Sequence, residues 1–200
     1  IFDGRSRFCN RFVIVGSYTV KAVPAGGHLS LPVSQIGMMM VERKNVLFLC
    51  TGNSARSILA EGLLQHLGGA RYQAFSAGSK PTGAPHRGAL AILVEKGIDT
   101  GFAHSKSWDV FASPTAPQMD LIITVCGNAA GEVCPVWPGH PNNAHWGIDD
   151  PAAASGEDAI RTAFATAYAR LHRRVSAFLA LEGDDIITKM DAIRAIGDME

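Results

Sequence analysis

One stretch, Asn45 to Leu67, constrains the fold of this chain more than any other part of its sequence. It opens with an unbroken apolar run, Val46 to Leu49, which is typical of a strand buried on both faces. Apolar residues then recur at helical spacing, and a Gly-Gly pair gives a stop signal: Ile58, Leu59, Leu63, Leu64 and Leu67, then Gly68-Gly69. The stretch therefore predicts a strand, a tight loop and a helix. A loop in this place gathers backbone N–H groups at the positive end of a helix dipole, which favours binding of a tetrahedral oxyanion.

Two side chains decide what chemistry this loop could perform. Cys50 opens it and Arg56 closes it, with five residues between them. A guanidinium can hold two oxygens of an anion at once, which an ammonium does less well. The same positive field favours the thiolate form of Cys50, and a hydroxyl hydrogen of Ser57 or Ser54 could stabilise the sulfur further. The loop predicts a nucleophile beneath a bound oxyanion, although an inert core cysteine at a strand end stays open.

Strand and helix patterns alternate along the rest of the chain. Further strands are predicted at Tyr72 to Phe75, Asp120 to Val125 and Asn143 to Trp146. Helices are predicted after Pro85, with Leu90, Leu93 and Val94 facing the core, and over residues 157–181. This alternation predicts a single α/β domain with a central four-stranded parallel sheet and helices on both faces. Ligands of such sheets bind at the carboxyl ends of the strands, and Cys50, Cys126 and Asp150 all follow predicted strand ends.

The two ends of the chain differ in pattern from this domain. In residues 1–39, Gly, Pro and Ser interrupt each apolar cluster, position 1 is not Met, and Met38-Met39-Met40 stands just before the first strand. We expect residues 1–39 to be a disordered or non-native extension, with a partner-binding arm as the alternative. The domain is expected at residues 40–182. Residues 183–200 form a tail with apolar residues at near-helical spacing, which could dock on the domain or on a second copy.

Composition narrows the function classes. With 47% apolar residues in a chain of 200, a substantial core can form. The 18 basic and 18 acidic residues balance, so no global field attracts nucleic acid or an anionic membrane. No apolar stretch is long enough to span a membrane. Four cysteines are too few for a secreted disulfide scaffold, which favours a cytoplasmic protein with catalytic or redox thiols.

The loop sequence, Cys50-Thr51-Gly52-Asn53-Ser54-Ala55-Arg56-Ser57 after an apolar strand, resembles the phosphate-binding loop of a known family. That family comprises the low-molecular-weight protein tyrosine phosphatases and the arsenate reductases that share their fold. The resemblance extends from about Val46 to Leu181. It implies that Cys50 is the nucleophile, that Thr51 to Arg56 bind the oxyanion, and that Asp150 of Asp150-Pro151 is the general acid. A solvated Asp150, or Asp149 in its place, stays open as an alternative.

Cys126 and Cys134 separate the two branches of this family. They flank a loop of small residues, whereas the phosphatases need only one thiolate. Ala152 and Ala153 follow Pro151, where phosphatases of the family usually carry aromatic residues. The late thiol pair, together with His145-Trp146-Gly147, resembles the thioredoxin-coupled arsenate reductases.

That resemblance implies arsenate as substrate and a relay of three thiols. Cys126 would attack Cys50, Cys134 would then attack Cys126, and thioredoxin would reduce the resulting disulfide, with glutaredoxin or a small thiol as the alternative donor. No tightly bound cofactor is expected. Cys126 and Cys134 stand one residue further apart than in some family members.

Several other interpretations stay open. The chain could be a phosphatase acting through a cysteinyl-phosphate, with the late thiols protecting Cys50 from overoxidation, or a non-catalytic oxyanion sensor. The late thiols could be inert, or could bind zinc with His140 and His145, although their spacing fits no usual zinc pattern. No metal is otherwise expected. Three residues match a potassium site of some family members, while Ser107 stands where its acidic ligand is expected: Asn53, Glu61 and Ser76.

Overall fold

The computed structural model describes residues 43–127, 142–181, 183 and 185–200. Predictions that concern residues 1–39, including Cys9, lie outside this part of the chain. So do Cys134 and His140.

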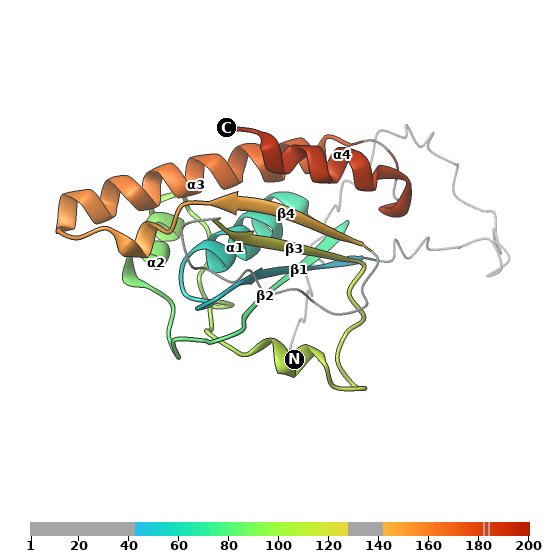
Figure 1. Cartoon of the computed structure of the whole chain (residues 1–200), viewed down its shortest axis with the longest axis horizontal. Helices are drawn as coiled ribbons and strands as arrows, with labels where there is room; N and C mark the ends of the chain where they lie inside the picture. Colours follow the sequence, from blue (N-terminus) through green and yellow to red (C-terminus); the bar gives the residue numbers. More distant parts are fainter. Residues whose placement is uncertain (1–42, 128–141, 182, 184) are drawn as a thin grey trace, which may run out of the picture. The chain divides into compact units, whose positions relative to one another are not determined.

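Four parallel strands form one sheet, as predicted (Figure 1). The strands are β1 (Lys44–Cys50), β2 (Tyr72–Gly78), β3 (Leu121–Cys126) and β4 (Asn143–Ile148), in the spatial order β2-β1-β3-β4. The central strands β1 and β3 are almost fully buried, which explains their continuous apolar sequences. Because all four strands are parallel, their carboxyl ends meet at one edge of the sheet.

One face of the sheet carries the main core. Four α-helices contribute side chains to it: α1 (Arg56–Gly68), α2 (Arg87–Glu95), α3 (Glu157–Leu179) and α4 (Met190–Ala195). Along α3, a stripe of buried residues at helical spacing faces the sheet: Phe164, Ala167, Leu171, Val175 and Phe178. The Tyr72 ring of β2 contacts the Phe178 ring, with centroids 4.8 Å apart.

The opposite face has a smaller core of Leu47, Leu49, Ala77 and Ile122. Trp108 and Phe111 of the short 3₁₀ helix η2 (Trp108–Phe111) pack against it. Within the described ranges, η2 is the helical element on this face. None of the helices in those ranges is long and apolar enough to cross a membrane.

The sequence-based assignment of the core-facing residues of α2 was partly wrong. Leu90, Leu93 and Val94 were expected to face the core; Leu93 is fully buried, but Leu90 is only half-buried and Val94 is 64% exposed. The buried residues of α2 are Ala89, Ile92 and Leu93, at i, i+3 and i+4 spacing. Successive residues of a helix point about 100° apart, so Val94 lies on the outer side of this short helix.

The C-terminal segment packs on its own domain. After α3 the chain forms the 3₁₀ helix η4 (Ile187–Lys189), α4 and the 3₁₀ helix η5 (Ile196–Asp198), and α4 lies alongside β4 (Figure 1). Trp146 of β4 is fully buried and donates from Nε1 to the Ile193 carbonyl at 2.9 Å. This segment covers the core-facing side of the edge strand β4, where Ala144, Trp146 and Ile148 are buried, while Asn143 and His145 are exposed.

A β-bulge interrupts β4 shortly before its end. Thr124 of β3 pairs with His145, and Cys126 pairs with Ile148. Two residues of β4, Trp146 and Gly147, therefore stand opposite Val125 alone. Bulges bend a strand and redirect the residues that follow, which here are Ile148, Asp149 and Asp150.

Candidate active site

The loop between β1 and α1 holds the Cys50 sulfur at the carboxyl edge of the sheet. Cys50 ends β1 and is 2% exposed. The backbone N–H of Asn53 donates to Sγ at 3.2 Å, and Ser57 Oγ lies 3.0 Å from Sγ. Asn53 Nδ2 donates to Ser57 Oγ at 3.0 Å, which leaves the hydroxyl hydrogen of Ser57 to point toward the sulfur. Two hydrogen-bond donors therefore converge on the Cys50 sulfur.

Asn53 is the centre of the loop's internal hydrogen bonding. Its side chain is fully buried, and besides Ser57 it donates to Ser76 Oγ at 2.8 Å and accepts from the Lys106 backbone N–H at 2.8 Å. Its φ angle of 43° lies in the left-handed region, which Asn tolerates better than most residues. This conformation turns the backbone N–H of Asn53 toward Cys50.

A buried carboxyl group lies behind this network. Ser76 Oγ donates to Glu61 Oε2 at 2.5 Å, and Glu61 is only 4% exposed. Burial raises the pKa of Glu61 to about 7, although the positive charge of Lys106 and the hydrogen bond from Ser76 oppose the shift. Hydrogen bonds thus run from Glu61 through Ser76, Asn53 and Ser57 to the Cys50 sulfur.

The residues matched to a potassium site therefore do lie together. Asn53, Glu61 and Ser76 satisfy one another directly, while the Ser107 hydroxyl donates to Asp109 Oδ2 at 2.7 Å instead. Potassium binding was only an alternative to the expected absence of a metal, and it stays untested. In the part of the chain that the structure describes, no three His, Cys, Asp or Glu side chains are grouped as metal ligands.

Neighbouring loops hold the loop between β1 and α1 in shape. The Thr82 backbone N–H and the Ser105 hydroxyl both donate to the Gly52 carbonyl, at 3.0 and 3.1 Å, and the Lys80 N–H donates to the Thr51 carbonyl at 2.9 Å. Within the described ranges, no side chain caps the N-terminus of α1, and the buried Thr51 hydroxyl has no hydrogen-bond partner. Backbone N–H groups at a helix N-terminus that no side chain caps are suited to binding an oxyanion.

Arg56 links the loop to the segment that follows β4. Its side chain is buried, Nη1 donates to the Ile148 carbonyl at 3.3 Å, and Nη2 lies 3.3 Å from Asp150 Oδ2. Asp150 is one-third exposed, and its Oδ1 accepts from the Ala152 N–H at 3.1 Å at the start of the 3₁₀ helix η3 (Pro151–Ala153). The carboxyl group is thus fixed beside the guanidinium.

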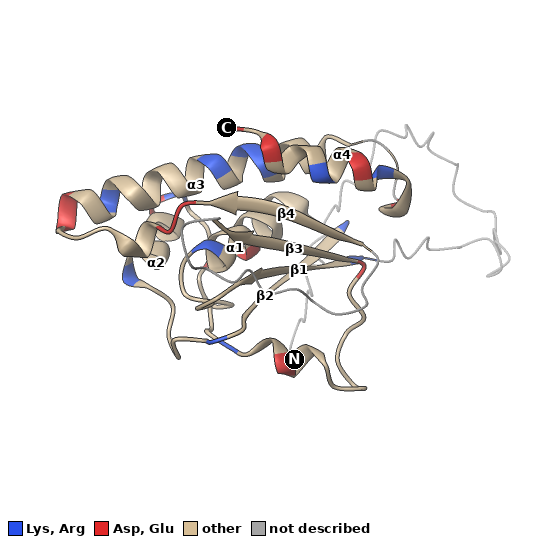
Figure 2. Cartoon of the chain, viewed as in Figure 1, with Lys and Arg blue, Asp and Glu red and all other residues tan. Residues whose placement is uncertain are grey.

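Asp149 has a different position. Its carboxylate is 94% exposed and pairs with Arg170 of α3 at 3.4 Å. Figure 2 shows the acidic stretch that follows β4, and basic residues on α3 beyond its acidic first turn. Of the two adjacent carboxylates, only Asp150 contacts Arg56 in the described ranges.

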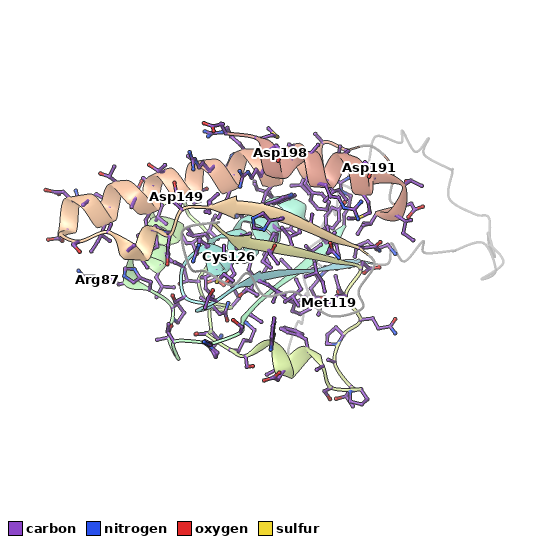
Figure 3. The ribbon with its side chains drawn as sticks, in the orientation of Figure 1. Arg87, Met119, Cys126, Asp149, Asp191 and Asp198 are labelled. Atoms are coloured by element: carbon purple, nitrogen blue, oxygen red, sulfur yellow. The ribbon has the colours of Figure 1, made fainter. Side chains whose placement is uncertain are left out.

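Cys126 ends β3 at the same edge of the sheet (Figure 3). Its side chain is fully buried, and it forms no disulfide with Cys50. Leu49 pairs with Thr124, and adjacent strands lie about 4.8 Å apart, so Cys50 ends its strand opposite Val125 and Cys126 follows one residue further along β3. Cys50 belongs to the core on the α1 face, and alternation along β3 directs Thr124 and Cys126 to the other face. Cys134, the remaining thiol of the predicted relay, lies outside the described residues.

One functional candidate was not foreseen from the sequence. Arg174 of α3 is 5% exposed and donates to backbone carbonyls of β4 and of the C-terminal segment. The signal was present, since Arg174 stands in the apolar stripe between Leu171 and Phe178. An arginine on the buried face of a helix needs acceptors, and none could be named without the structure.

Comparisons with known proteins agree with this arrangement. The model of the low molecular weight phosphotyrosine protein phosphatase family matches residues 45–189. The arsenate reductase of Bacillus subtilis (strain 168) is 39% identical over 124 residues, which are 62% of this chain and 86% of that protein. The arsenate reductase of Brevibacillus brevis is 41% identical over 113 residues, 56% of this chain and 81% of that protein. The crystal structure of an arsenate reductase from Archaeoglobus fulgidus superposes with a TM-score of 0.52 at 28% identity, covering 66% of this chain and 98% of that one.

Proposed function

The chain belongs to the low molecular weight phosphotyrosine protein phosphatase family, and we propose that within this family it is an arsenate reductase that passes electrons through three thiols. The observation that carries the proposal is the Cys50 sulfur, held by Asn53 N–H and Ser57 Oγ in a loop closed by the Arg56–Asp150 pair. The two arsenate reductases described above align with this chain over most of their own length, which supports arsenate as the oxyanion.

The first step joins sulfur to arsenic. Arsenate enters the loop, where the backbone N–H groups and Arg56 bind its oxygens. The Cys50 thiolate attacks arsenic, and Asp150 gives its proton to the oxygen that departs as water. The product is a Cys50 thiol–arsenate adduct in which arsenic is still pentavalent.

The second step moves two electrons. The Cys126 thiolate attacks the Cys50 sulfur, the sulfur–arsenic bond breaks, and its electron pair stays on arsenic. Arsenic leaves as arsenite, and a Cys50–Cys126 disulfide forms. Cys134 then attacks Cys126, which frees Cys50 and leaves a Cys126–Cys134 disulfide for an external dithiol to reduce. We propose thioredoxin as that dithiol, with glutaredoxin or a small thiol as the alternative.

Formation of the Cys50–Cys126 disulfide requires a change of backbone conformation. A disulfide needs Cα atoms about 4.4–6.8 Å apart and facing Cβ vectors. The backbones of Cys50 and Cys126 lie on adjacent strands, but the two side chains belong to opposite faces of the sheet. The end of β3 must therefore turn when Cys126 attacks, and Gly127 directly after it allows such a change of backbone conformation.

A coupled assay on the full chain tests the proposal. Arsenate-dependent oxidation of NADPH by thioredoxin reductase and thioredoxin should proceed with the unmodified protein and vanish in Cys126→Ser and in Cys134→Ser. Cys9→Ser is the matched control and should retain turnover. Replacing thioredoxin with glutathione and glutaredoxin identifies the donor.

A phosphatase is the second candidate, because the same Cys50, Arg56 and Asp150 geometry suits a cysteinyl-phosphate mechanism and the family model describes phosphatases. Phosphatase turnover would survive Cys126→Ser and Cys134→Ser, since it needs one thiolate. Hydrolysis of para-nitrophenyl phosphate by both variants, with no arsenate turnover by the unmodified chain, would favour the phosphatase over the reductase.

A further inference from the structure

Arg174 binds backbone carbonyls from two segments that are far apart in sequence. Nη1 donates to the carbonyls of Trp146 and Gly147, at 2.9 and 3.1 Å. Nη2 donates to the carbonyls of Gly197 and Met199, at 2.9 and 2.8 Å, and Nε donates to Met199 at 3.2 Å. Every acceptor named here is a neutral carbonyl, so the guanidinium ties two backbones together rather than neutralising a carboxylate.

The first pair of acceptors is the β-bulge of β4. Trp146 and Gly147 are the two residues that stand opposite Val125. A side chain at position 147 would not fit this bend, since an added Cβ would lie 2.6 Å from His145 Nε2 and 2.9 Å from the Cys126 carbonyl. The geometry of the bulge decides where the chain goes next, and Arg174 holds both of its carbonyls.

The residues that follow the bulge belong to the site. The Ile148 carbonyl accepts from Arg56 Nη1, and Asp150 Oδ2 pairs with Arg56 Nη2. Only Ile148 and Asp149 separate the bulge from Asp150. A shift of the bulge would therefore move the proposed proton donor relative to Cys50.

The second pair of acceptors comes from the C-terminal segment, which is itself fastened to β4. Gly197 lies so close to the His145 carbonyl that an added Cβ would overlap it. Trp146 donates to the Ile193 carbonyl, and Arg194 Nε donates to the Asn143 carbonyl at 3.2 Å. Ile193 and Ile196 anchor the segment in the main core.

From this arrangement we propose that Arg174 is a positioning residue for Asp150, supported by the C-terminal segment 190–199. It acts through the bulge of β4 and touches neither arsenate nor Cys50. The proposal rests on the proposed reductase function, in which Asp150 protonates the departing oxygen. Misplacing a reacting group by about 1 Å can cost roughly 100-fold in rate.

A double-mutant cycle in the full chain tests this proposal. Arg174→Gln should lower kcat for arsenate reduction by roughly 100-fold. Protection of Cys50 from iodoacetamide by arsenate should be unchanged, because the anion loop is not altered. In the Asp150→Asn background the same change should have no further effect on kcat, because there is no proton donor left to position. Arg173→Gln is the matched control, since Arg173 donates to the Glu200 carbonyl rather than to β4, and should leave kcat unchanged.

The results that would refute the positioning role of Arg174 differ from those that would refute the reductase function. If Arg174→Gln lowers kcat equally with and without Asp150, or leaves kcat unchanged, Arg174 is structural only and the proposal is wrong. If Arg174→Gln does not fold, Arg174→Lys keeps a charge and fewer hydrogen bonds, and the same cycle with this variant decides the matter. If the unmodified chain reduces no arsenate, the proposed function fails as well, whereas normal turnover by both Arg174 variants refutes only this inference.

Discussion

Arg56 and Asp150 form an ion pair, with Nη2 and Oδ2 3.3 Å apart, that joins the loop after β1 to the loop after β4. The Asp150 side chain is one-third exposed, whereas the Arg56 guanidinium is buried. A bound oxyanion would take over Arg56 and leave Asp150 facing the oxygen that must depart. In the proposed mechanism, the pair would therefore couple arsenate binding to the placement of the proton donor, Asp150.

Asp150→Asn should separate binding from turnover. Removing the carboxylate removes a competitor for Arg56, so arsenate should protect Cys50 from iodoacetamide at lower concentration. Turnover should fall by about 10²–10⁴-fold, because proton donation to the leaving oxygen is lost. Asp149→Asn, which alters only an exposed pair with Arg170, is the control and should keep full activity. If arsenate protected Cys50 less well in Asp150→Asn than in the unmodified chain, Asp150 would not be competing with arsenate for Arg56.

Arg56→Lys should impair anion binding although charge is retained. The guanidinium reaches both the Ile148 carbonyl and Asp150, whereas an ammonium lacks the planar pair of donors that matches two oxygens. We expect arsenate or phosphate to protect Cys50 only at much higher concentration, measured by alkylation rate. Equal protection in the variant and the unmodified chain would show that the backbone of the loop alone binds the anion.

Replacement of Asn53 should reveal the contribution of its backbone conformation. Asn53→Ala removes three side-chain hydrogen bonds in a fully buried site, which should lower the free energy of unfolding by about 2–4 kcal/mol. Asn53→Gly loses the same bonds but adopts a positive φ without penalty, so it should be more stable than Asn53→Ala by about 1 kcal/mol. Urea unfolding measures both, and an Ala variant at least as stable as the Gly variant would argue against strain at this position.

Glu61 should make stability depend on pH. Its pKa is raised from 4.5 to about 7 in the folded chain, so the folded state binds a proton more tightly than the unfolded state. The stability that this proton contributes is fully present below about pH 4.5 and is lost as pH rises through about 7.

Glu61→Gln keeps an acceptor for Ser76 but does not titrate. The free energy of unfolding of the unmodified chain should therefore fall relative to Glu61→Gln, by up to about 3 kcal/mol, as pH rises over this range. Urea unfolding at several pH values checks this. Parallel pH profiles for the two proteins would mean that Glu61 is ionised throughout, as it would be beside a bound cation.

The sequence predicted the elements whose local pattern and tertiary environment agree. The apolar runs of β1 and β3 are buried in the sheet centre, and the stripe of α3 faces the core as its spacing indicates. The prediction that Val94 faces the core was wrong, because an apolar residue next to a buried one in a short helix can lie on either the core side or the solvent side. Strand order, and with it the neighbourhood of Cys50 and Cys126, followed from long-range pairing that no local pattern encodes.

The site was predictable where one continuous segment builds it. Cys50, Arg56 and Ser57 lie on a single strand-loop-helix unit, so their proximity follows from local geometry. The Arg56–Asp150 pair joins residues that are 94 positions apart in the sequence, and Arg174 binds the Trp146 carbonyl 28 positions away. Both interactions depend on how the segments pack. The roles of Cys126 and Cys134 stay predictions that chemistry must test.

The most direct test is a single turnover without any reductant. Fully reduced chain is mixed with arsenate, the remaining thiols are alkylated, and the peptides are mapped by mass spectrometry while arsenite is quantified. The account predicts one arsenite per chain and a Cys126–Cys134 disulfide, and in Cys134→Ser a trapped Cys50–Cys126 disulfide. Full alkylation of Cys50, Cys126 and Cys134 with no arsenite formed would contradict it.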